Sequence, residues 1–142
     1  MPWYDYSVTP NGSKPLVTVR LWHGARQVKL VALVDSGADV SAMDASYADL
    51  LGLDRAQAVV DEITTAGGGS ARCLRWPNVV LEIQFETARY SFKGVFVEFP
   101  ADADPVNLLG RADFFQPFIV QFWDAAEVMN IDISPDYPRP AP

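Results

Sequence analysis

Short runs of apolar residues, separated by turn residues, recur along most of the chain and predict a fold built mainly of β-strands. Residues 16–22 contain β-branched side chains in partial alternation, which is typical of a strand. After a turn at residues 23–24, residues 27–34 are extended again. Their second half is apolar without a break, which predicts a strand buried on both faces. This strand leads directly into Asp35.

Further strands are predicted downstream, at residues 59–65, 71–76, 78–87, 90–99, 118–123 and 127–133. The first two of these form a long hairpin whose tip is the glycine-rich segment 66–70. Two short helices interrupt the strands. One runs from Asp44, as N-cap, to Gly52, and the other covers residues 112–115 and stops near Pro117. The pattern therefore predicts an all-β fold with one or two short helices.

The length of 142 residues fits one domain with a real hydrophobic core. Residues 1–14 are rich in turn residues and predict an N-terminal arm, and residues 15–133 form the domain. Residues 134–142 make a Pro-rich C-terminal tail, for which we expect no fold of its own.

The formal net charge of −7 argues against nucleic acid as a partner, because phosphate binding needs a basic surface. The sequence has no apolar run of about 18 residues, so we expect no membrane span. The N-terminal segment lacks the basic and apolar regions of a signal peptide, and a cytoplasmic location is expected.

The chain has one histidine, His23, and one cysteine, Cys73. An internal disulfide, a Cys-rich zinc site and a multi-histidine metal site are therefore excluded within one chain. A Ser-His-Asp or Cys-His mechanism would have to use a single turn histidine as its base. Any catalysis is expected to depend on carboxylates, without a metal or cofactor.

Asp35 is the strongest candidate because a carboxylate at the end of a buried strand needs an explanation. Gly37 permits a tight turn that presents this carboxylate to a cleft, and the Ser36 hydroxyl can hydrogen-bond the neighbouring backbone. Taken alone, Asp-Ser-Gly is also a common surface turn, and that interpretation stays open at this point.

The segment Leu33-Val34-Asp35-Ser36-Gly37-Ala38-Asp39-Val40-Ser41 resembles the active-site loop of retropepsin-like aspartic peptidases. Downstream, Leu108-Leu109-Gly110-Arg111 is similar to the apolar-apolar-Gly-Arg motif of that family. The glycine-rich hairpin lies between the two motifs, where the family carries its flap. The resemblance covers residues 15–133 and implies a closed or orthogonal β-barrel with a flap hairpin.

The resemblance also implies roles for individual residues. Asp35 would be the catalytic acid and base, within an active-site loop completed by Ser36, Gly37 and Ala38. Asp39 would contact the substrate backbone and pair with Arg111, which would otherwise be an ordinary surface arginine. Three glycines at the tip of the flap would bind the substrate: Gly67, Gly68 and Gly69. A phosphate-binding role for these glycines is disfavoured because no Gly-Lys-Ser/Thr sequence follows them.

An aspartic peptidase needs two aspartates that share one proton, and this chain has a single Asp-Ser/Thr-Gly segment. The resemblance therefore implies a homodimeric endopeptidase in which each copy supplies one Asp35 and the substrate is a peptide or protein. Two alternatives remain: a catalytically silent domain of the same type that binds peptides or dimerises, and an unrelated β-barrel binding module in which Asp35 is a turn residue.

Overall fold

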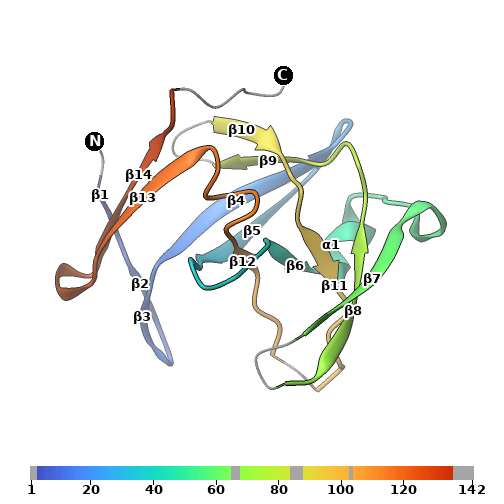
Figure 1. Cartoon of the computed structure of the whole chain (residues 1–142), viewed down its shortest axis with the longest axis horizontal. Helices are drawn as coiled ribbons and strands as arrows, with labels where there is room; N and C mark the ends of the chain where they lie inside the picture. The colour runs from blue at the N-terminus through green and yellow to red at the C-terminus, as the bar shows by residue number, and fades with distance from the viewer. Residues whose placement is uncertain (1–2, 65–67, 84–87, 103, 136–142) are drawn as a thin grey trace.

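The computed structural model describes residues 3–64, 68–83, 88–102 and 104–135, and its architecture is mostly β (Figure 1). The all-β class predicted from the sequence is confirmed. Within the described residues there is one α-helix, α1 (Ala45–Leu50), together with two single turns of 3-10 helix, η1 (Arg55–Gln57) and η2 (Asp124–Ala126).

The main sheet has nine strands in the order β10-β9-β4-β5-β12-β6-β11-β8-β7. Their bounds are β4 (Leu16–His23), β5 (Arg26–Val34), β6 (Ala42–Asp44), β7 (Val59–Thr64), β8 (Ser70–Arg75), β9 (Val80–Ile83), β10 (Ala88–Ser91), β11 (Val95–Val97) and β12 (Leu108–Leu109). The sheet curls into a half-barrel, with β4 and β5 on one side and the β7–β8 hairpin on the other (Figure 1).

The chain ends complete a smaller, three-stranded sheet in the order β1-β14-β13. It consists of β1 (Trp3–Asp5), β13 (Phe118–Trp123) and β14 (Val128–Ile133), and a separate hairpin joins β2 (Ser7–Thr9) to β3 (Gly12–Lys14). The N-terminal arm thus contributes a strand that pairs with β14 (Figure 1).

The main hydrophobic core is formed by side chains of the large sheet, of α1, of the turns after β12 and of the small sheet. Leu21 of β4 and Leu81 and Ile83 of β9 are fully buried, and Phe114 stacks on Phe118 with ring centroids 4.9 Å apart. Burying side chains of this size stabilises the fold by about 1.5–3 kcal/mol each. The inner face of the small sheet joins the same core through Met129 and Ile131.

Several predicted elements are confirmed. The strands at 16–22 and 27–34, the hairpin of β7 and β8, and the strands β13 and β14 all form. The predicted helix at 44–52 is α1, which is followed by Gly52 in the left-handed region at φ 72°. Such a φ favours glycine because it lacks a Cβ.

Three predictions are wrong in detail. The strand at 90–99 is broken into β10 and β11, because the chain leaves β9 and crosses to β6 and β8 at residues 92–94. The segment 112–115 forms turns, not a helix, and Pro117 has no N–H with which to continue one. In β5 the apolar half alternates, with Ala32 buried but Val31 51% exposed, so this strand is covered on one face only.

The predicted C-terminal tail falls largely outside the described residues, from residue 136 onward. Among the residues that are described, no helix has the length and apolar character needed to cross a membrane.

Candidate functional site

The Asp35 loop follows β5 directly and is held by the backbone around it. The Asp35 N–H donates to the Leu109 carbonyl at 2.9 Å, and the Gly37 N–H donates to Asp35 Oδ1, also at 2.9 Å. A hydrogen bond from a backbone N–H two residues ahead is the form of turn that aspartate favours. This hydrogen bond fixes one carboxylate oxygen of Asp35. Asp35 is half-buried, and it lines a groove.

Strand β12 brings the second sequence motif to this loop. It lies between β5 and β6, where Leu108 pairs with Leu33 in parallel and with Ala42 in antiparallel register. Beyond β12, the Arg111 N–H donates to the Ala38 carbonyl at 2.9 Å and the Ala112 N–H to the Asp39 carbonyl at 2.8 Å. The two motifs, far apart in sequence, form one hydrogen-bonded unit.

Gly110 allows the two motifs to come this close. A Cβ built at this position would lie 2.4 Å from both the carbonyl carbon and the carbonyl oxygen of Val40, and 2.9 Å from the Ala38 carbonyl oxygen. Real Cβ atoms do not approach backbone atoms at such distances, so any side chain would push the loops apart. The glycine of the motif is therefore required by close approach.

Next to the loop lies a buried polar pair, Ser41 and Asp113, to which the sequence analysis gave no role. Ser41 and Asp113 are 0% and 2% exposed. The Ser41 hydroxyl donates to Asp113 Oδ1 at 2.5 Å and accepts from the Gly110 N–H at 2.9 Å. The Ser41 N–H also donates to Asp113 Oδ1, at 3.2 Å. The pair thus links the start of β6 to the end of β12 and to the turns that follow β12.

Burial in apolar surroundings raises the pKa of the Asp113 carboxyl, because the charged form loses hydration. The hydrogen bonds from Ser41 favour the charged form and oppose this effect only in part. The sequence contains one signal that could have pointed to this pair: Asp113 is the only polar residue in the segment from Ala112 to Phe115. A carboxylate there needs buried donors, which the sequence could not locate.

A groove of about 580 Å³ opens beside Asp35. One wall is the loop itself, and the opposite wall comes from the β7–β8 hairpin. The lining residues are Asp35, Gly37, Ala38, Asp39, Val40, Ala42, Ile63, Thr64, Arg75 and Leu108. Carboxylate, apolar and cationic groups thus face a space large enough for several residues of an extended peptide.

The predicted site residues do not all gather in this groove. Ser36 and Arg111 are exposed and do not line it, and neither do Gly68 and Gly69 at the hairpin tip. Gly68 has a φ of 81°, which suits glycine. Gly67 lies outside the described residues.

The predicted ion pair between Asp39 and Arg111 does not form within the described part of this single chain. The four ion pairs found there join Arg55 to Asp49 and Glu98, Arg72 to Glu98, and Arg89 to Glu82. Both Asp39 and Arg111 are exposed. The link between their segments is made by the backbone hydrogen bonds described above, which do not depend on side-chain charge.

The chemistry available in the groove is that of carboxylates. Within the described residues, no group of three or more His, Cys, Asp or Glu side chains could hold a metal ion. A scan against family models and a search of curated proteins each gave no match to this chain. The function must therefore be inferred from the site alone.

Proposed function

We propose that this chain is a homodimeric aspartic endopeptidase of the retropepsin-like type. The observation that carries the proposal is the Asp35 carboxylate, fixed by the Gly37 N–H at the end of β5, in a groove whose far wall is a hairpin. An orienting hydrogen bond, partial exposure and a hairpin over the groove suit a carboxylate that acts on an extended peptide.

The reaction needs two such carboxylates. Two aspartates in one site resist joint ionisation and hold a single proton between them, as is general for aspartic peptidases. The ionised aspartate takes a proton from a water molecule, which attacks the peptide carbonyl. The protonated aspartate donates to the carbonyl oxygen, and the proton later reaches the leaving amine. In this proposal Asp35 of a second copy completes the pair.

An exposed apolar edge supports self-association. Strand β13 is at the edge of the small sheet, and it leaves Ile119 and Trp123 54% and 58% exposed. Trp123 meets Trp3 edge to face, with ring centroids 6.2 Å apart. An edge strand that carries exposed apolar side chains is a common site of strand-to-strand association.

The test is cleavage of a diverse peptide mixture, read by mass spectrometry across roughly pH 4 to 7, where a shared-proton pair is expected to work. Asp35→Asn is compared with the wild type at the same high protein concentration. Asp44→Asn serves as a matched control, because Asp44 lies outside the groove and caps α1 without a side-chain hydrogen bond to the helix backbone.

We expect discrete internal cuts from the wild type and from Asp44→Asn, and none from Asp35→Asn. The pattern of cuts would also give the subsite preference. If a protein shown to be dimeric makes no cuts, the peptidase proposal is overturned in favour of a silent domain that binds peptides or dimerises. Cuts that survive in Asp35→Asn would equally overturn it.

A further inference from the structure

A second pocket lies between the two edges of the curled sheet. It has a volume of about 520 Å³, and its lining comes from the start of β7, the β8–β9 connection and the end of β10. Strands β7 and β10 are the first and last of the nine-stranded order, so among the described strands their outer edges are unpaired. Of the described residues, Arg75 alone lines both this pocket and the Asp35 groove.

The floor of this pocket is aromatic. Trp76 and Phe92 are each nearly buried, and both meet Phe96 edge to face, with centroid distances of 5.6 and 5.5 Å. The Trp76 Nε1–H donates to the Asp54 carbonyl at 2.7 Å, which fixes the indole ring. Val59, which is 64% exposed, also lines the pocket. The floor is therefore rigid and apolar and is ready to receive an apolar side chain.

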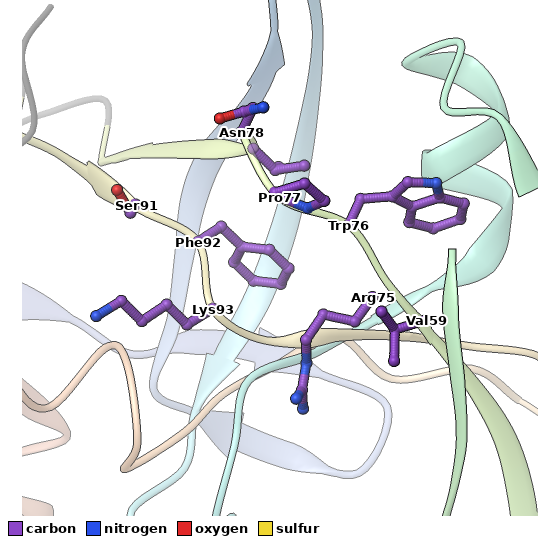
Figure 2. A pocket seen from close by; sticks show the side chains of 9 residues that line it. Val59, Arg75, Trp76, Pro77, Asn78, Ser91, Phe92 and Lys93 are labelled. Carbon is purple, nitrogen blue, oxygen red and sulfur yellow. The ribbon is translucent and has the colours of Figure 1, made fainter. Parts of the chain in front are cut away.

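Two cations flank this floor. Figure 2 shows the Phe92 ring between the side chains of Lys93 and Arg75, with Val59 and Trp76 beyond Arg75. Neither Lys93 nor Arg75 takes part in the four ion pairs that join described residues. Two free cations beside an apolar floor are notable in a chain whose net charge is −7.

We propose that this pocket binds an extended acidic peptide segment. An apolar side chain of the peptide packs on Trp76 and Phe92, and flanking carboxylates meet Lys93 and Arg75. An extended segment fits because it lies between two unpaired strand edges, which offer backbone hydrogen bonds. This site goes beyond the proposed peptidase function and does not depend on it, since it leaves Asp35 outside.

The probe is a fluorescein-labelled heptapeptide, Asp-Leu-Asp-Phe-Asp-Leu-Asp, and its counterpart with lysine in place of aspartate. The full chain carrying Asp35→Asn is used so that the probe is not cut. Because the protein is strongly acidic, general electrostatics would repel this probe and attract the lysine counterpart. Saturable binding of the acidic probe alone therefore reports a local basic site.

The variant Lys93→Glu is compared with Lys29→Glu, which makes the same charge change at an exposed position of β5. We expect Lys93→Glu to weaken binding roughly fivefold or more, the size of one surface charge contact, and Lys29→Glu to leave it nearly unchanged. Circular dichroism confirms that both variants fold, since both side chains are exposed.

Amide chemical shifts locate the bound probe. Changes at Val59 and at residues 91–93 are expected, and changes confined to residues 35–40 would place the probe in the Asp35 groove and overturn the proposal. Absence of saturable binding, or equal loss of affinity in the two lysine variants, would also overturn it. Because the probe contacts neither Asp35 nor its loop, this result is independent of whether the chain cleaves peptides.

Discussion

Ser41 satisfies two buried partners at once, the Asp113 carboxylate and the Gly110 N–H. Replacing it by alanine leaves both without this hydroxyl in a site closed to water. We expect Ser41→Ala to lower the free energy of unfolding by about 2–3 kcal/mol, because a buried hydrogen bond to a carboxyl group is lost and the Gly110 N–H is left without this partner. Chemical denaturation measures the change.

The matched control for this substitution is Ser46→Ala. The Ser46 hydroxyl donates to Asp44 Oδ2 at 2.6 Å, but the residue is exposed, so water can replace the bond. Its effect is expected to stay below about 0.5 kcal/mol. Equal losses in the two serine variants would mean that burial of the Ser41 network contributes nothing.

Asp113 makes stability depend on pH in a defined direction. Burial raises its pKa in the folded protein above the ordinary value of 3.8, so the folded state holds this proton more tightly than the unfolded state does. The resulting stabilisation is complete below 3.8 and is lost as the pH rises through the raised pKa.

The variant Asp113→Asn cannot titrate at this position. As the pH rises from 3.8 through the raised pKa of Asp113, the free energy of unfolding of the wild type should therefore fall relative to that of the variant. The slope cannot exceed about 1.4 kcal/mol per pH unit for one proton. Denaturation of both proteins at closely spaced pH values measures the difference. Parallel curves for the two proteins would show that the pKa of Asp113 is not raised.

At the level of single residues, the sequence indicated the groups that carry local signals. Asp35 and Gly37 stood out because a carboxylate and a turn glycine followed an apolar strand. Ser41 and Asp113 did not stand out, since their importance comes from a contact across 72 positions. Burial of a polar pair depends on the tertiary fold, which a local pattern does not encode.

Near the short strands around Asp35, two glycines lie where one backbone segment packs directly against another. At Gly110 the backbone of Val40 leaves no room for a Cβ, and at Gly94 a Cβ would lie 2.3 Å from the Ser41 carbonyl oxygen. Gly94 is also where the predicted strand 90–99 breaks. The sequence pattern predicted one strand here because apolar residues stand on both sides of Lys93 and Gly94, and the pattern does not reveal the close contact at Gly94.

We expect Gly110→Ala to destabilise the protein by about 2–3 kcal/mol or more, because backbone on both sides must move. Gly24→Ala is the control, since a Cβ there meets nothing within 4 Å and only the positive φ of 58° opposes it. Its cost is expected near 1 kcal/mol. Thermal denaturation compares them, and a smaller loss at Gly110 than at Gly24 would contradict the close packing.

At the scale of the whole molecule, one chain supplies one Asp35, so the proposed activity belongs to a pair of chains. Adding Asp35→Asn protein to the wild type at constant total concentration should form mixed pairs with a single aspartate. Total activity should then follow the square of the wild-type fraction, falling to about one quarter in an equal mixture.

Peptide cleavage after full exchange of subunits measures this dependence. Asp44→Asn protein, added in the same way, should leave activity undiminished because it can complete the pair. If activity falls only in proportion to the wild-type fraction, each chain works alone and the shared-proton mechanism does not hold.

The placement of β12 between β5 and β6 also has a consequence in time. During synthesis the ribosome releases Asp35 long before Leu108, the residue that pairs with both Leu33 and Ala42. Until that late segment arrives, the Asp35 loop lacks the carbonyl of Leu109 that holds its N–H. The hydrogen-bonded form of the Asp35 loop can therefore assemble only after residues 108–109 have been made, so the order of synthesis separates the two halves of the candidate site in time.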